Sequence, residues 1–254
     1  MQKKDTISVI IPCYNCQPYI EDTVRSVLSQ TLPPDEILLI EDGSSDNTLS
    51  MLRKLEQQDS RIHLYENEGN RGVAYSRNRG VSLATGEWVA FLDSDDQWTI
   101  HKLRRQMAFL NAKQAEFAFT GSAFLDETGQ RYRGTLAVPE TVDRKTLLHQ
   151  NVISCSSVII RRSLMARYPM KSGEIHEDFD AWLRILGEIP MAYGLNEPLL
   201  LYRLRGDSKS GNKWKSFQMN YKTYRSVGLN PLSAAVNMCY YTKNGLKKYR
   251  NIRK

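Results

Sequence analysis

The stretch WVAFLDSDD (residues 88–96) is a short apolar run that ends abruptly in acids. A continuous apolar run of this length is typical of a strand buried on both faces of a parallel sheet. Three similar runs precede it along the chain, and a polar loop follows each of them. They cover residues 7–11, 37–40 and 62–65.

Helical patterns separate these runs. Apolar residues at helical spacing predict a helix near residues 20–28, and a third helix is expected over 73–83. Between them, Asp46 is expected to cap a helix that runs to about Gln58. This alternation predicts an α/β fold in which helices cover both faces of a mostly parallel sheet. Ligands of such sheets bind outside the carboxyl ends of the strands. Three loops should therefore converge on one crevice: those with Tyr14 and Asn15, with Glu41 and Asp42, and with Asp93 and Asp95.

The pattern loosens after Gln97. It still predicts further strands and helices, and the chain beyond residue 212 resembles basic helices with a break at Asn230-Pro231. No G-x-G-x-x-G or G-x-x-x-x-G-K motif supports a dinucleotide site or a P-loop. The expected helices cover 102–110 and 179–186, the latter behind acids, and the expected strands cover 117–124, 158–160 and 198–202.

Charge is distributed unevenly along the 254 residues, which carry +7 in total. Residues 201–254 hold thirteen Lys and Arg and one acid, a balance of +12, whereas residues 1–200 carry −5. A basic tail on an acidic body favours contact with an anionic surface, either phospholipid or nucleic acid. A merely solvated charged end is the simpler alternative.

Cysteine usage and hydropathy indicate the compartment. Four cysteines are too few for a disulfide framework, and the Cys13–Cys16 pair lacks the second pair that a zinc site needs. No secretory signal and no apolar stretch of about 20 residues is visible. We therefore expect a cytoplasmic protein, or one held peripherally at the cytoplasmic face of the inner membrane.

Asp93 and Asp95 close the strand that contains Phe91. Two carboxylates one residue apart at a strand end can face one cation, and Mg²⁺ or Mn²⁺ takes oxygen ligands. Such a cation neutralises the charge that develops on a diphosphate leaving group. Taken alone the motif is weak, because the same spacing is common in turns and helix caps.

Five motifs in order give the acid pair a context. They are ISVIIPCYN (7–15), EDGSSDNT (41–48), RNRG (77–80), ATGE (84–87) and FLDSDD (91–96). Together they closely resemble family 2 glycosyltransferases, which have the GT-A fold, most strongly over residues 7–98. The resemblance implies a catalytic domain over 1–211, with a nucleotide-sugar-binding half (1–98) and an acceptor-binding half (99–211), and a basic helical tail over 212–254.

The resemblance also assigns roles in binding the donor. An aromatic at Tyr14 can stack on the nucleotide base, and carboxylates accept hydrogen bonds from base and ribose. Asp95 is the implied metal ligand, and Asp93 touches the ribose, the metal or its water. Arg77 approaches the phosphates or buttresses Asp93, although a structural ion pair is an equal alternative. The implied nucleotide-binding residues are Pro12, Tyr14, Asn15, Glu41, Asp42, Arg77, Asp93 and Arg205.

The stretch HEDFDAWLR (176–184) resembles the family's Glu-Asp motif at the head of a helix. Inversion by direct displacement needs one carboxylate near the acceptor hydroxyl, and we assign this general base to Asp178. Glu177 is expected to orient it or to bind the acceptor. Asp180 should leave the helix in another direction. Acids enriched at a helix N-terminus are the structural alternative.

One position departs from the family pattern. In YRLRGDSKS (202–210), Arg205 stands where relatives often have a metal-binding His. Arginine cannot bind a cation but can clamp diphosphate oxygens, so metal dependence is open to question. The stretch 206–211 resembles a mobile flap over the donor.

The resemblance implies an inverting, metal-dependent hexosyltransferase that uses Mn²⁺ or Mg²⁺. The expected donor is a UDP-sugar, and the expected acceptor is a glycan on a polyprenyl diphosphate lipid, in bacterial polysaccharide or O-antigen synthesis. The tail is then expected to meet an anionic membrane rather than nucleic acid. Two alternatives remain: a nucleotidyltransferase, which should show a Gly- and Arg-rich first loop, and a basic nucleic-acid-binding protein.

Overall fold

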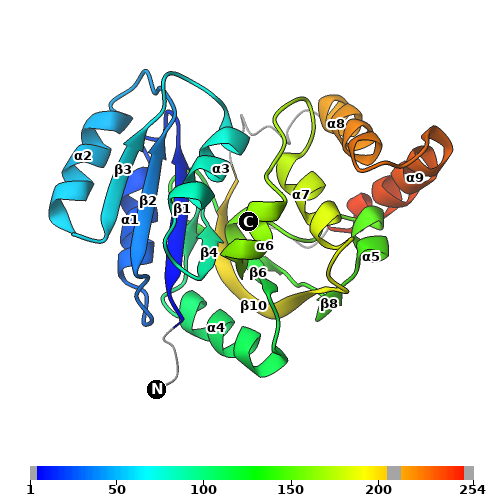
Figure 1. Ribbon diagram of the computed structural model, residues 1–254, viewed down its shortest axis with the longest axis horizontal. Coiled ribbons are helices and arrows are strands. Elements are labelled where there is room, and N and C mark those ends of the chain that lie inside the picture. The colour runs from blue at the N-terminus through cyan, green and yellow to red at the C-terminus, as the bar shows by residue number, and fades with distance from the viewer. Residues whose placement is uncertain (1–4, 205–212, 249–254) are drawn as a thin grey trace.

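The computed structural model describes residues 5–204 and 213–248. One mixed sheet crosses the molecule in the order β3-β2-β1-β4-β9-β6-β10-β5, with helices on both faces (Figure 1). This is the predicted α/β architecture. The path strands are β1 Ile7–Cys13, β2 Glu36–Glu41, β3 Ile62–Glu66, β4 Trp88–Phe91, β5 Gln97–Trp98, β6 Phe117–Leu125, β9 Ile159–Arg161 and β10 Ala192–Arg203, with β7 Arg131–Leu136 on β6 and β8 Thr141–Val142 on β10.

The parallel and antiparallel parts of the sheet have different positions. Strands β3, β2, β1 and β4 are mutually parallel, as predicted, and β6 pairs with β10 in parallel. Strand β9 runs antiparallel between β4 and β6 and joins the two parallel groups. The sequence predicted β9 as a strand but gave no sign of its direction, because pairing partners lie far apart in the chain.

The helices confirm most of the predicted positions. Helix α2 begins one residue later than predicted, since Asn47 is the cap residue, although the Asp46 carboxylate accepts from the Thr48 N–H at 3.0 Å. The acids of 177–180 lie inside the first turn of α7 rather than before it. The helices are α1 Ile20–Leu28, α2 Thr48–Gln58, α3 Val73–Leu83, α4 Lys102–Lys113, α5 Arg144–His149, α6 Arg162–Arg167, α7 Glu177–Ile185, α8 Lys213–Ser226 and α9 Pro231–Lys248.

Two apolar layers hold the helices on the sheet. Alternate residues of β1 point to opposite faces, so Ile10 joins one buried cluster while Val9 and Ile11 join the other. Gly80 brings α3 close to β1, because a Cβ at this position would lie 2.4 Å from Ile10 Cγ2. The RNRG motif thus has a packing role beside its charged residues.

The basic tail helices pack against the catalytic unit. Tyr224 of α8 and Ala234 and Met238 of α9 are buried in the cluster that contains Trp182 of α7. In Figure 1, α8 and α9 lie beside α7 and α5, at the end of the molecule far from α2. The predicted domain boundaries at residues 98 and 211 stay predictions. Helices α8 and α9 contribute buried residues to the same hydrophobic core as α7.

Candidate active site

A cavity of about 540 Å³ opens at the carboxyl ends of β1, β2 and β4. The predicted convergence of strand-end loops is therefore correct. Seven of the predicted site residues line the cavity: Pro12, Tyr14, Asp42, Arg77, Asp93, Asp95 and Glu177. The other lining residues are Cys13, Asn70, Gly72, Val73, Ser76, Ser94, Tyr202 and Arg203.

Arg77 joins two acids on either side of this cavity. Its Nη2 atom lies 2.5 Å from Asp93 Oδ1, and its Nη1 atom lies 3.0 Å from Glu177 Oε1. The Arg77 side chain is only 5% exposed, so these two carboxylates are its main charge partners. The ion pair both buttresses Asp93 and links the loop after β4 to the start of α7. A role of Arg77 toward the donor phosphates stays a prediction.

The acidic loop after β4 is fixed from two sides. The Arg203 N–H donates to Asp96 Oδ1 at 2.9 Å, and Arg203 Nε donates to the Asp95 carbonyl at 2.8 Å. The Thr23 hydroxyl donates to the carbonyls of Ser94 and Asp96. Burial, and then the neighbouring acids, raise the pKa of Asp96 well above its usual range. Asp96 is therefore a buried support of the loop, while Asp93 and Asp95 face the cavity.

Tyr14 suits the predicted stacking role, because its ring lines the cavity and is 48% exposed. Asp42 also lines the cavity, where its carboxylate accepts from the N–H groups of Arg71 and Gly72 at 2.9 and 2.8 Å. It therefore shapes the loop before α3. No motif in the sequence marked this loop as a wall of the site, although Gly72 has the positive φ that favours glycine.

Glu41 and Asn15 do not line the cavity. The Glu41 carboxylate accepts from the N–H groups of Gly43 and Ser44, and Asn15 Oδ1 accepts from the Ser45 N–H. Both side chains thus brace the loop after β2. Contact with a nucleotide stays a prediction for these two residues. Arg205 and the stretch 206–211 lie outside the described residues.

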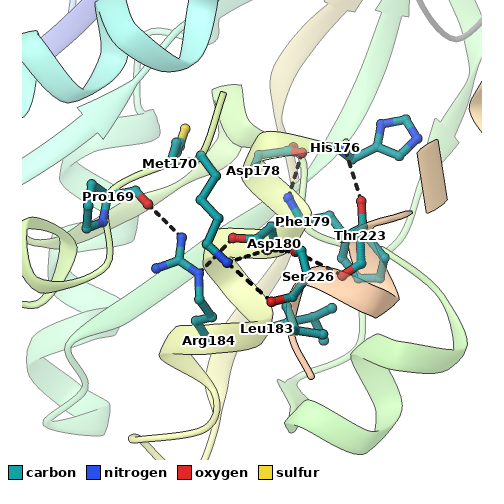
Figure 2. Close-up of polar contacts among 12 residues, drawn as sticks. Pro169, Met170, His176, Asp178, Phe179, Asp180, Leu183, Arg184, Thr223 and Ser226 are labelled. Carbon is teal, nitrogen blue, oxygen red and sulfur yellow. Dashed lines mark hydrogen bonds and ion pairs between the residues drawn. The ribbon is translucent and has the colours of Figure 1, made fainter. Parts of the chain in front are cut away.

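Asp178 is half-buried in the first turn of α7, next to Glu177. Burial, and then the Glu177 charge, raise the pKa of Asp178 to about 6, against the opposing effect of Arg77. A carboxyl with a pKa near neutrality is suited to accepting a proton. Asp180 is fully buried and points elsewhere, to Arg184 Nε at 2.7 Å, as the sequence predicted (Figure 2).

The donor set at the cavity fits a hard cation with few protein ligands. Asp93 and Asp95 offer carboxylate oxygens at one strand end, although Arg77 already holds one oxygen of Asp93. Within residues 5–204 and 213–248, no group of three His, Cys, Asp or Glu side chains is arranged to hold a metal. A cation here would take its remaining ligands from phosphate oxygens and water, as Mg²⁺ commonly does.

Arg203 is the site residue that the sequence analysis missed. It lines the cavity, and its guanidinium lies 4.8 Å from the centre of the Tyr19 ring. The signal was present, since Arg203 follows Tyr202 in the stretch 202–210. In that stretch only Arg205 was predicted to have a role.

Comparison with known proteins places this fold and site in a class. Residues 8–168 match the family model described as glycosyl transferase family 2, and the chain belongs to that family. It is a glycosyltransferase with the GT-A fold.

Relatives and a solved structure agree with this assignment. The chain is 37% identical to the putative teichuronic acid biosynthesis glycosyltransferase TuaG of Bacillus subtilis, over 96% of this chain and 98% of that protein. It is 32% identical to the UDP-Glc:alpha-D-GlcNAc-diphosphoundecaprenol beta-1,3-glucosyltransferase WfaP of Escherichia coli, over 96% of each. The structure of S. aureus TarS 1-349 in complex with UDP-GlcNAc superposes with a TM-score of 0.74 at 19% identity, covering 95% of this chain and 73% of that one.

Proposed function

We propose that this protein transfers a hexose from a UDP-sugar to a lipid-linked saccharide, with inversion at the anomeric carbon. The observation that carries the proposal is the bridge of Arg77 between Asp93 and Glu177. It places the acidic strand end and the acidic helix start at one cavity. A donor diphosphate and an acceptor hydroxyl can then meet there.

Each side of the cavity has its own task in the proposal. Tyr14 stacks on the base, and Asp93 and Asp95 would hold Mn²⁺ or Mg²⁺. When bound, the cation would neutralise the charge that develops on the leaving diphosphate. Arg203, which lines the cavity, adds positive charge near the same group.

Asp178 is the proposed general base, and Glu177 orients the acceptor beside it. As the acceptor oxygen bonds to the anomeric carbon, the bond from that carbon to the diphosphate oxygen breaks. The hydroxyl proton passes to the Asp178 carboxylate. One displacement inverts the anomeric configuration. The relative WfaP supports this outcome, because it is a beta-1,3-glucosyltransferase that uses UDP-Glc, and the glucosyl group of UDP-Glc is ordinarily alpha-linked.

A lipid-linked acceptor would bring the protein to the cytoplasmic face of the inner membrane. None of the described helices has both the length and the apolar content to cross a bilayer. Helices α8 and α9 instead expose apolar side chains at helical spacing, and residues 213–248 contain Lys and Arg but no acid. Such a surface suits peripheral binding to anionic lipid. The exposed side chains are Trp214, Phe217 and Tyr221 on α8 and Leu232, Val236 and Tyr240 on α9.

The test is an assay with a panel of donors and acceptors. The purified chain is incubated with UDP-glucose, UDP-galactose, UDP-GlcNAc or GDP-mannose and with GlcNAc-diphosphoundecaprenol or a teichuronic acid fragment, with and without Mn²⁺. We expect UDP release that depends on the acceptor and a product with inverted configuration. Release of pyrophosphate from UTP and a sugar phosphate would instead indicate a nucleotidyltransferase, and a retained configuration would overturn the single displacement.

A further inference from the structure

The start of α7 is attached to α8. Helix α7 has no side-chain cap at its own N-terminus. The N–H of His176, the residue before it, donates to Thr223 Oγ1 in α8 at 3.0 Å. Thr223 is fully buried, and its hydroxyl donates in turn to the Met219 carbonyl at 2.8 Å. The Thr223 hydroxyl thus accepts one hydrogen bond and donates another. The bond that it accepts from His176 connects the two helices, whereas the bond that it donates stays within α8.

Asp180 provides a second attachment, which Figure 2 shows between α7 and α8. The Ser226 hydroxyl donates to Asp180 Oδ1, and Arg184 Nε donates to Asp180 Oδ2 at 2.7 Å. Lys171 Nζ lies 3.5 Å from Asp180 Oδ1 and donates to the Ser226 carbonyl at 3.3 Å. The buried carboxylate is thus satisfied by donors from three segments, which a buried charge requires.

Aromatic packing provides a third attachment. The rings of Phe179 and Tyr224 meet edge to face, with their centres 5.8 Å apart. His176, Phe179 and Asp180 lie on one side of the first turn, because successive helical residues are about 100° apart. Asp178 falls on the opposite side of that turn. Contacts with α8 therefore hold one side of this turn, and the proposed base Asp178 lies on the other side.

The same turn is connected to the donor side. Arg77 Nη1 reaches Glu177, and Asn78 of α3 exchanges two hydrogen bonds with the backbone of Met170, at 2.7 and 2.8 Å. The segment around Met170 is linked to α7 through Arg184, whose Nη2 donates to the Pro169 carbonyl at 2.6 Å. Helix α7 is thus held between α3, which lines the donor cavity, and α8.

We infer that Thr223 and Ser226 of α8 are positioning residues for sugar transfer. Their hydroxyl groups fix the first turn of α7, so that Glu177 and Asp178 stay beside Arg77 and the donor cavity. The inference rests on the proposed role of Asp178 as base. Misplacement of a reacting group by about 1 Å can lower a rate by about 10²-fold. Helix α8 is on this view part of the catalytic apparatus as well as a basic surface.

The test compares Thr223→Val and Ser226→Ala in the full chain with the donor and acceptor pair that the panel selects. Thr223→Val keeps a branched side chain but leaves the His176 N–H without its acceptor. We expect kcat to fall about 10- to 10²-fold, while the KM for the UDP-sugar and the affinity for UDP stay within about twofold of the original values, because the donor does not touch α8. Hydrogen exchange in peptides covering 176–183 should become faster. Thr223→Ser, which restores the hydroxyl, should recover most of kcat.

Thr242→Val on α9 is the matched control, because it makes the same substitution. It removes the hydrogen bond from the Thr242 hydroxyl to the Met238 carbonyl, which lies within α9. We expect it to leave kcat unchanged. If Thr223→Val lowers only the thermal midpoint, or if Thr242→Val reduces kcat equally, the positioning role is wrong. Should Thr223→Val fail to fold, Ser226→Ala decides in the same way.

Asp178→Asn separates this inference from the proposed function. An inactive Asp178→Asn together with fully active Thr223→Val and Ser226→Ala overturns only the role of α8. An active Asp178→Asn overturns the proposed base itself.

Discussion

The guanidinium of Arg77 lies 2.5 Å from the Asp93 carboxylate, and the side chain of this arginine is 95% shielded from solvent. Its second nitrogen reaches Glu177 at 3.0 Å. The buried guanidinium of Arg77 therefore fixes the distance between the acids at the end of β4 and helix α7. An arginine suits this position because its planar group can serve two carboxylates at once, whereas a lysine offers one compact charge.

Arg77→Met is expected to destabilise the protein by about 3 kcal/mol, because removal of one partner leaves charged groups at a partly buried site. Urea unfolding of the variant and the original chain measures this difference. Arg53→Met is the control, since its pair with Glu66 is exposed on both sides and such pairs contribute about 0–1 kcal/mol. If the free energy of unfolding falls equally in the two variants, the buried Arg77 contributes no more to stability than an exposed arginine.

The same substitution should move the pH profile. The Arg77 charge lowers the pKa of Asp178 against the larger effects of burial and Glu177. Without Arg77, the pKa of Asp178 rises above about 6, so the ionised base is formed only at higher pH. The acid limb of kcat should therefore shift toward higher pH in Arg77→Met. A limb that stays in place or shifts downward would mean that Asp178 is not the group that titrates.

Asp178→Asn should lower kcat by about 10²–10⁴-fold, because the amide cannot accept the acceptor proton. Affinity for UDP should be nearly unchanged. Stability should change in the opposite direction, since the folded-state pKa of about 6 lies above the usual aspartate value of 3.8. The folded protein then favours the protonated carboxyl, so this group stabilises the fold below about pH 4 and loses that contribution as pH rises through about 6.

At pH 8 the Asn variant is therefore expected to be about 1–3 kcal/mol more stable than the original chain, and the difference should shrink toward pH 4. Urea unfolding at several pH values measures it. The matched control Glu174→Gln removes an exposed carboxylate and should show no such gain at pH 8. A variant less stable than the original at pH 8 would contradict the assigned pKa.

Asp180→Asn tests the register of the acidic motif. Asp180 is fully buried and pairs with Arg184 and Lys171, so loss of its charge should cost about 3 kcal/mol of stability. The amide still accepts from Ser226, so kcat should fall much less than in Asp178→Asn. Activity measured well below the thermal midpoint separates the two effects. An inactive, stable Asp180→Asn beside an active Asp178→Asn would place the base at 180.

Metal dependence rests on Asp95. Calorimetry with UDP and Mn²⁺ should show binding to the original chain that is lost when the metal is removed with EDTA. Asp95→Ala should lose at least about tenfold in affinity, or about 1.4 kcal/mol, and stay folded because its side chain is at the cavity wall. Asp22→Ala, at an exposed ion pair, should bind as the original does. Equal UDP affinity with and without Mn²⁺ would show that the arginines replace the metal.

Local patterns in the sequence were enough to predict the first half of the fold. The apolar runs of β1, β2 and β4 are buried on both faces, whereas β3 at the sheet edge is only partly buried. The loops that follow parallel strands must meet at one edge. The direction of β9 and the edge strands β7 and β8 depended on partners distant in the chain, which periodicity does not reveal. For the site, residue types predicted Asp93, Asp95 and Glu177 at the cavity. They did not predict that Glu41 and Asn15 brace the loop after β2.

The tail shows another limit of sequence reading. Its charge predicted a basic helical segment, and α8 and α9 are helices. Their buried residues, Tyr224 and Ala234 among them, follow the same helical spacing as the exposed ones. Composition alone therefore suggested a separable appendage, whereas the packing makes α8 part of the core around α7.

Membrane binding is the last prediction, and truncation is a poor test of it because the tail contributes to the core. Trp214 and Leu232 are 69% and 76% exposed, so replacement of both by Ser should leave the fold intact. Insertion of each side chain into lipid contributes roughly 1.5–3 kcal/mol when complete. Trp214→Ser with Leu232→Ser should thus weaken binding to vesicles of phosphatidylglycerol by at least about tenfold. The binding that remains should be electrostatic and should fall with added salt.

Ile100→Ser is the control for this double variant, since it removes an apolar side chain that is 51% exposed between β5 and α4. Equal pelleting of all three proteins with the vesicles at low salt would contradict a role for this surface, and tight binding to RNA in place of vesicles would reassign its charge to nucleic acid.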